Sequence, residues 1–497
     1  MNVFVRNAVV FHVFAIIAMF SWISGGTRAD LLVPVVPWFF LLLMAGMLFF
    51  PQNRHDETIV DARMRVWRGI SRDPLTWVAV AFIVLLAIPF VNRGLCPVCD
   101  YQLIAAGADP APPVSFLPYC VDASDHYGVF QWFFPAFGAM IAAKHALLKR
   151  GKRLLLEMMV WNAVALAILG FVQQASGATS PFWSGDPLPG YFFSAWGYPN
   201  MAGDYFTFHF AVAAGLWQYR IAQVANAPRA HEFDSIKGPA HPFMQAHYML
   251  LPVMILFIAA LDTLSRAAII LSIGLFFATL LLMFFGYFWK ASRAGRLKMC
   301  IFGAMSLVVV SFLAFTFAPD DLRNEASTIT TDEVFKRVGG KGQYHQRVAT
   351  AILKDNLAFG VGGWGYKHLC QSYMTESEFK QMQKVGGINV HDDYIQFSCE
   401  HGLIGAALLL AVIVLLLVPI IRAWQRFYNW AIFAPPNKAP AKPLAIYCMS
   451  PAALGVLMGC CATFIHSFGD CAMRSPAVLT TVVVSLVCTD GFFPKDR

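Results

Sequence analysis

The sequence predicts an all-α membrane protein that crosses the bilayer about twelve times. Hydrophobic residues make up 58% of the 497 residues and charged residues only 13%, a balance typical of chains embedded in lipid rather than of several soluble domains. A helix needs about 20 mostly apolar residues to cross about 30 Å of hydrocarbon. Runs of this kind are centred near residues 16, 41, 83, 137, 164, 213, 254, 277, 308, 411, 457 and 483.

Basic residues in the connections predict how the spans are oriented, because Lys and Arg are retained on the cytoplasmic side. The second, fourth and eighth connections are basic, whereas the fifth, residues 175–203, contains no Lys or Arg. Both termini are therefore expected in the cytoplasm, and alternation places the long polar loop 319–401, between spans 9 and 10, outside. The net charge of +8 comes mainly from the Lys and Arg residues of these basic connections, so no nucleic-acid partner is expected.

Three cysteines fall in one outer connection. Cys96 and Cys99 form the motif CPVC, and Cys120 follows. In an oxidising compartment such a loop carries a disulfide more often than a redox or metal site, so we expect Cys96 or Cys99 to pair with Cys120. Several other cysteines lie within spans, where a thiol packs as a small apolar group.

The segment before the tenth span, VHDDYIQFSCEHGLIG, contains the strongest catalytic candidate. His391 and Asp392 are followed, after nine residues, by Gly402, and Gly405 opens a long apolar run. His391 thus lies just outside a membrane helix, and a histidine can accept a proton near neutral pH. Asp392 and Asp393 are expected to orient its ring and raise its basicity.

Two further polar positions lie at the outer ends of predicted spans. Arg266 follows a tight turn from Asp262 to Ser265. It is a cation on the side that the orientation rule disfavours and at a helix start, where the macrodipole disfavours it, so an anionic partner is expected, either Asp262 or a ligand phosphate. Asn200, after Pro199, is expected to cap the helix of the sixth span.

Within the long outer loop, the spacing of apolar residues predicts a short amphipathic helix over residues 342–355, with Val348, Ala351 and Ile352 on its apolar face. This helix is expected to lie at the membrane interface. Arg347 lies on this helix. The following GVGGWG satisfies G-x-G-x-x-G, but outside a βαβ unit it does not indicate a dinucleotide site; its glycines are expected to make a tight, mobile turn. In the last outer turn, Asp470 and Arg474 are expected to pair or to line the same site.

These segments resemble those of the O-antigen ligase and O-antigen polymerase superfamily over about residues 190–490. The superfamily has a histidine and a polar neighbour nine positions before a Gly-x-x-Gly, as at His391, although Asp392 stands where an uncharged residue is usual. Ser-Arg-Ala at Arg266, a Pro-Asn pair ending in Asn200, and Arg347 followed by Gly-x-Gly are also similar to superfamily segments.

The resemblance implies a GT-C-like helical fold in a bacterial inner membrane, with its active site facing the periplasm. The donor would be an undecaprenyl-diphosphate-linked glycan, and the acceptor either lipid A core, for a ligase, or a growing polysaccharide, for a polymerase; both remain open. No metal or cofactor is expected. The resemblance implies His391, Arg266 and Arg347 as catalytic residues and Arg266, Arg347 and Asn200 as binding residues; Asp392, beside His391, and Arg474, in the last outer turn, are also expected to bind substrate.

Residues 1–189 are expected to form an N-terminal set of spans 1–5 with the cysteine-containing loop, and residues 190–497 the ligase- or polymerase-like region, including loop 319–401. A protein oligosaccharyltransferase is the least favoured member of the superfamily. A twelve-span transporter is the alternative from another class, which would favour two six-span repeats.

Placement of the long loop outside is testable by labelling single-cysteine variants with a membrane-impermeant thiol reagent in intact cells. A cysteine at position 341 or 381 should be labelled without permeabilisation, because both positions fall between spans 9 and 10. Labelling only after permeabilisation would contradict the placement.

Overall fold

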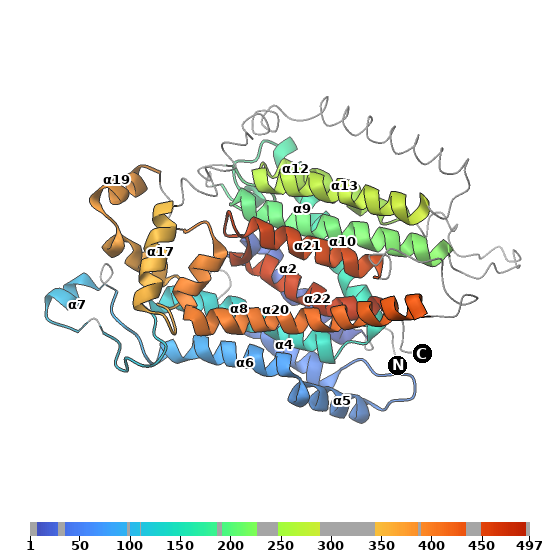
Figure 1. The fold of residues 1–497 in the computed structure, drawn as a ribbon, viewed down its shortest axis with the longest axis horizontal. Coiled ribbons are helices and arrows are strands. Elements are labelled where there is room, and N and C mark those ends of the chain that lie inside the picture. The colour runs from blue at the N-terminus through green and yellow to red at the C-terminus, as the bar shows by residue number, and fades with distance from the viewer. Residues whose placement is uncertain are drawn as a thin grey trace, which may run out of the picture. The chain divides into compact units, whose positions relative to one another are not determined.

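The computed structural model describes residues 7–27, 35–96, 100–109, 111–185, 191–225, 247–288, 343–385, 389–433 and 449–493. These residues form helices, with two isolated bridges and no sheet (Figure 1). The first part contains α2 (Ala8–Trp22), α4 (Val36–Phe49), α5 (Ile59–Arg72), α6 (Pro74–Ala87), α7 (Tyr101–Ala105), α8 (Ala123–His145), α9 (Lys149–Ala175), α10 (Pro199–Ala225), α12 (Leu250–Asp262) and α13 (Arg266–Phe288). From residue 343 onward the helices are α17 (Gln343–Asp355), α18 (Gly365–Leu369), α19 (Glu376–Val385), α20 (Asp393–Phe433), α21 (Pro451–His466) and α22 (Pro476–Cys488).

The predicted span centres fall on these helices, apart from the centre near residue 308, which lies outside the described residues. Among the described residues, α9, Arg266–Phe284 of α13 and Asp393–Arg426 of α20 are long and apolar enough to cross a bilayer. The α5–α6 region qualifies as one bent pair, with a bend of 66°, and α2, α4, α12, α21 and α22 are shorter apolar helices. The all-helical membrane-protein class is confirmed. The number of spans and the GT-C-like arrangement stay predictions.

The chain forms two compact units that interleave along the sequence. Unit 1 comprises Met1–Leu156, Thr331–Ile420 and Thr463–Gly491, and unit 2 comprises Glu157–Thr330, Ile421–Ala462 and Phe492–Arg497. Within unit 1, α8 packs against α2, α4, α6 and α22. Within unit 2, α10 packs against α12 and α13.

α17 confirms the amphipathic helix predicted in the long loop. Val348 and Ile352 on its apolar face are fully buried, and they pack with loop residues such as Tyr366 and Val390 and with Cys96 and Val121 of the earlier connection in one hydrophobic core. The expectation that this face lies at the membrane interface is therefore wrong. Covering an apolar face with other side chains removes it from water as effectively as lipid does, and here the loop and the connection that contains Cys96 and Val121 supply those side chains.

α20 is broken at Gly402, nine residues after its first residue Asp393 and thus about two and a half turns into the helix. Gly402 has φ 64° and ψ −177°, outside helical geometry, so the helix loses hydrogen bonds there. The glycine-rich segment after α17 replaces them: Val361 N donates to Cys399 O, Gly362 N to Glu400 O, and Leu403 N to Leu357 O. The tight turn predicted at GVGGWG is confirmed by positive φ angles at Gly360 and Gly362, and it is packed against the break.

The predicted pairing of Cys96 with Cys120 is wrong. The Cys120 thiol donates to Pro89 O at 3.5 Å, whereas Cys96 Sγ lies 3.8 Å from His368 Nδ1. Cys120 forms an isolated β-bridge with Arg93, three residues before Cys96, but the two thiols have different neighbours. The alternative pairing through Cys99 involves a position outside the described residues.

Gly402→Ala should destabilise the protein, whereas Gly274→Ala should not. A Cβ at Gly402 would lie 2.3 Å from Ala358 O in a backbone of positive φ, while a Cβ at Gly274, on α13, meets nothing within 4 Å. Backbone strain of this kind costs on the order of 1–3 kcal/mol, and the clash adds to it. Thermal unfolding in detergent, followed by tryptophan fluorescence, measures the difference; equal midpoints for the two variants would contradict the packing at the break.

Candidate functional site

His391 lies two residues before the start of α20 and has an unusual backbone conformation. Its φ is +54°, in the left-handed region that residues with a Cβ adopt rarely. The backbone is held on both sides, because Val390 N donates to Gln396 Oε1 at 3.0 Å and the Asp392 carboxylate accepts a bond from Ile395 N at 3.0 Å. Asp392 therefore caps the start of α20, and burial raises the pKa of its carboxyl. These contacts fix the direction in which the imidazole leaves the chain.

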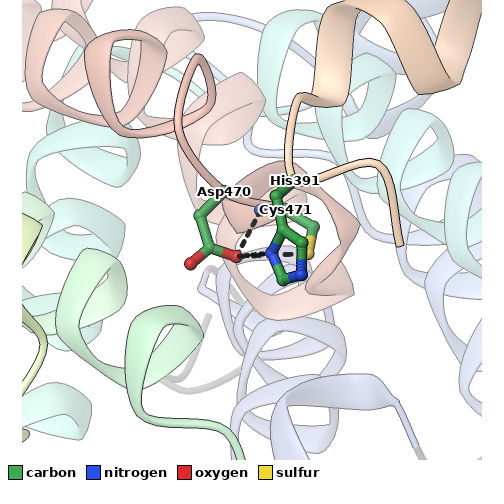
Figure 2. A group of neighbouring side chains, drawn as sticks. All are labelled: His391, Asp470 and Cys471. Atoms are coloured by element: carbon green, nitrogen blue, oxygen red, sulfur yellow. Dashed lines mark hydrogen bonds and ion pairs between the residues drawn. The ribbon is translucent and has the colours of Figure 1, made fainter. Parts of the chain in front are cut away.

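The carboxylate against the His391 ring comes from the turn after α21. His391 Nδ1 lies 3.5 Å from Asp470 Oδ1, and the imidazole is 45% exposed whereas the carboxylate is 8% exposed (Figure 2). Sequence reasoning assigned the orienting role to Asp392 and Asp393; the structure instead uses Asp392 as a helix cap and places Asp470 beside the ring. Only the polar character of the last outer turn pointed to Asp470, and nothing local in the sequence pairs it with His391.

Asp470 is itself held by its neighbour Cys471. The Cys471 N–H donates to Asp470 Oδ1 at 2.7 Å, and Cys471 Sγ donates to the same oxygen at 3.2 Å. Cys471 is almost fully buried, and burial raises the pKa of its thiol well above the usual range. One carboxylate oxygen thus receives a backbone amide, a thiol and the edge of an imidazole ring, as the dashed lines of Figure 2 show.

Arg474 is buried in a group of charges behind this turn. Its Nη2 lies 2.7 Å from Glu400 Oε2 and its Nε 3.8 Å from Asp393 Oδ1, and the three side chains are 1%, 1% and 2% exposed. The guanidinium lies over the Trp364 ring, 4.5 Å from its centroid. The expectation that Arg474 pairs with Asp470 is replaced by pairing with Glu400.

Asp393 links the same turn to α20 through the backbone. Its N–H donates to Ser467 O at 3.0 Å, and its Oδ2 accepts from Met473 N at 2.7 Å. The segment from Ser467 to Arg474 is therefore tied to the first two turns of α20 by one backbone–backbone hydrogen bond, one hydrogen bond from a backbone N–H to the Asp393 carboxylate, and the ion pair of Arg474 with Glu400. This attachment places Asp470 beside His391.

Arg347 extends from α17 to the next helix of the loop. Its Nε and Nη2 lie 2.9 and 2.5 Å from the two carboxylate oxygens of Glu378, and Nη2 also donates to Tyr373 O at 3.1 Å. Hydrogen bonds from Arg347 lower the pKa of Glu378 to about 2. The guanidinium is 49% exposed, and it already holds an anion in the two-pronged geometry that also suits phosphate.

Arg266 and Asn200 lie in unit 2, each in the first turn of a helix. α12 ends at Asp262 and α13 begins at Arg266, so the predicted tight turn is confirmed. Asn200 is the second residue of α10, and its side chain donates to Tyr198 Oη at 3.1 Å; it does not precede the helix as a cap, contrary to expectation. Gly203 lets the start of α10 pack closely on α13, since a Cβ there would lie 2.6 Å from Ala268 Cβ.

Two groups among the described residues bring three metal-ligating atoms within 4.8 Å of one another. One consists of His391, Asp470 and Cys471, and the other of Asp122, Asp125 and His368. In the second group Lys367 Nζ lies 3.1 Å from Asp125 Oδ2, and His368 Nε2 lies 2.8 Å from the same oxygen. That carboxylate is thus already paired with an ammonium group. The hydrogen bond with His368 is the main cause of the lowered pKa of Asp125.

Comparison with known families identifies part of the chain. Residues 251–410 match the family model described as O-Antigen ligase, a segment that contains Arg266, Arg347, His391 and the broken start of α20 and ends before Asp470. No curated protein matches the chain. The matched family implies a multi-pass membrane enzyme that resembles glycosyltransferases, of the glycan ligase or polymerase type. The match over residues 251–410 thus confirms the resemblance to the O-antigen ligase superfamily.

Proposed function

We propose that the chain transfers a glycan from an undecaprenyl-diphosphate-linked donor to an acceptor hydroxyl at the periplasmic face of a bacterial inner membrane. The acceptor favoured is lipid A core, as in an O-antigen ligase. The observation that carries the proposal is the half-exposed His391 imidazole, backed by a buried carboxylate, at the head of an apolar helix. A GT-C-like arrangement of about twelve spans belongs to the same proposal.

His391 is proposed to act as the general base. With Nδ1 turned toward Asp470, a neutral imidazole carrying its proton on Nδ1 presents the lone pair of Nε2 to the acceptor. The acceptor oxygen bonds to the anomeric carbon of the donor glycan and gives its proton to Nε2, while the bond from that carbon to the diphosphate breaks and its electron pair leaves with the lipid diphosphate. Proton acceptance in such a step contributes typically about 10²–10⁴-fold.

Arg347 and Arg266 are proposed to bind the diphosphate and to stabilise its charge as it leaves. A guanidinium stays charged at any physiological pH and binds phosphate through two parallel N–H groups. The paired contact of Arg347 with both oxygens of Glu378 supports this role, because phosphate oxygens can replace the carboxylate with the same geometry. With fixed positive charges at the leaving group, the proposed reaction needs no metal ion.

Deleting the gene and analysing lipid-linked and surface glycans together tests the proposed function. Loss of a ligase should leave long polymer on the lipid carrier and an unmodified surface acceptor, because polymerisation continues without transfer. Single repeat units in place of polymer would identify a polymerase instead. Unchanged glycan pools together with a defect in solute uptake or export would overturn glycosyl transfer in favour of transport.

Site variants should separate chemistry from folding when transfer is measured with purified protein and preformed donor. We expect His391→Ala to lower kcat by about 10²–10⁴-fold, and Asp470→Asn to lower it less, because the amide still occupies the space beside Nδ1 but no longer stabilises the imidazolium. Arg266→Lys and Arg347→Lys should lose most activity, since an ammonium group cannot bind phosphate through two parallel bonds.

Glu376→Gln is the matched control for these variants. Glu376 lies in the same loop, 82% exposed and paired only locally with Lys380, so its loss should leave kcat unchanged. Wild-type kcat in the His391→Ala variant, at normal amounts of folded protein, would remove His391 from the proposed mechanism.

A further inference from the structure

His391, Asp470 and Cys471 present three different kinds of metal-ligating atom at one point. The imidazole Nδ1 and the carboxylate Oδ1 are 3.5 Å apart, the thiol Sγ is 3.2 Å from the same Oδ1, and all three ligand atoms lie within 4.8 Å of one another (Figure 2). The three side chains come from two segments far apart in the sequence, the head of α20 and the turn after α21.

These separations fit a tetrahedral ion of the size of zinc. Zn²⁺ binds nitrogen at about 2.0–2.1 Å, oxygen at about 2.0–2.2 Å and sulfur at about 2.3 Å, lengths that separate neighbouring ligand atoms in a tetrahedron by about 3.4–3.6 Å. The nitrogen–oxygen distance already agrees, the sulfur–oxygen distance of 3.2 Å is a few tenths of an ångström too short, and the nitrogen and sulfur ligand atoms lie within 4.8 Å of each other. The half-exposed His391 ring gives the ion a path from solvent.

The chemistry of the ligands selects the class of ion. Mg²⁺ and Ca²⁺ require several oxygen ligands, whereas a set of thiolate, imidazole and carboxylate favours Zn²⁺ or a similar borderline-soft divalent ion. The other cluster, Asp122, Asp125 and His368, has no comparable claim, because the Lys367 ammonium already lies 3.1 Å from Asp125.

We propose that His391, Asp470 and Cys471 bind a zinc-class divalent ion, and that the bound ion inhibits the glycan transfer proposed above. Cys471 binds as a thiolate and releases its proton to solvent. The ion takes the lone pair of His391 Nδ1, so the neutral ring must carry its proton on Nε2. Nε2 then has no lone pair with which to accept the proton of the acceptor hydroxyl. The inhibitory part of this inference rests on the proposed function; the binding part does not.

Cobalt(II) gives a direct readout of binding by the purified full-length protein. A Co²⁺ ion bound to a thiolate shows a sulfur-to-metal charge-transfer band in the near ultraviolet, and we expect this band to saturate at one equivalent and to disappear when Zn²⁺ is added. Cys471→Ser, which keeps a hydrogen-bond donor for Asp470, should abolish the band, and His391→Gln should weaken Co²⁺ affinity by about tenfold or more.

Two matched variants exclude other sources of the signal. Asp125→Asn removes a ligand of the second cluster, and Cys461→Ser removes an exposed thiol on α21; both should keep the band. A wild-type protein without the band, or a Cys471→Ser variant that retains it, would overturn the site. If size-exclusion chromatography shows that Cys471→Ser is unfolded, the Co²⁺ titration of His391→Gln alone tests the site. A Co²⁺ affinity of His391→Gln equal to that of the wild-type protein would then overturn the site.

Transfer assays with and without Zn²⁺ separate this inference from the proposed function. Zn²⁺ should inhibit the wild-type enzyme, a chelator should restore its activity, and Cys471→Ser should be inhibited at least tenfold less strongly relative to its own activity without Zn²⁺. Transfer that Zn²⁺ leaves unchanged would overturn the inhibitory site and leave the proposed function standing. A cobalt band in a protein that transfers no glycan would support the metal site and overturn both the proposed function and the inhibition.

Discussion

Unit 1 is organised by the break of α20 at Gly402. A helix that enters hydrocarbon must have its backbone groups hydrogen-bonded within the protein, and at the break the donors and acceptors come from residues 357–362. Each such bond contributes only about 0.5–1.5 kcal/mol net, but leaving a buried group unpaired costs more. The loop segment must therefore follow α20 closely. The α17 core, the Trp364 ring and the backbone around His391 are placed as a consequence.

The buried charges extend this constraint to the end of the chain. Glu400 lies just before the break, and its partner Arg474 lies in the turn between α21 and α22. A buried ion pair contributes little net stability, because desolvation offsets the attraction, but loss of one partner is costly. The pair thus serves mainly to fix position. It holds the 467–474 turn against α20 and, with the bonds of Asp393, brings Asp470 to the His391 ring.

The same contact gives the His391 ring two possible uses. A carboxylate beside Nδ1 favours the tautomer in which Nε2 carries the lone pair, which is the arrangement that the proposed transfer needs. Adding the Cys471 thiol next to that carboxylate produces a ligand set for a zinc-class ion at Nδ1. A bound ion would reverse the tautomer. The ion and the proton that the catalytic tautomer carries would then compete for Nδ1.

The sequence by itself determined those features that depend on neighbours along the chain. Apolar length predicted helices at the described span positions, the turn from Asp262 to Arg266 followed from a polar interruption, and α17 followed from the periodicity of Val348 and Ile352. His391 could be singled out because its spacing to Gly402 and Gly405 is a local pattern that resembles a known family.

Only the tertiary structure decided which distant groups meet. It placed Asp470 rather than Asp392 or Asp393 beside the His391 ring, paired Arg474 with Glu400, put His368 beside Cys96, and turned the apolar face of α17 into the core of the loop. The polar segments before α20 and after α21 contain several carboxylates, cations and thiols that are chemically interchangeable in a sequence. Which of them come within 4 Å of each other is set by how the break in α20 and the final turn fold together, and no local pattern contains that information.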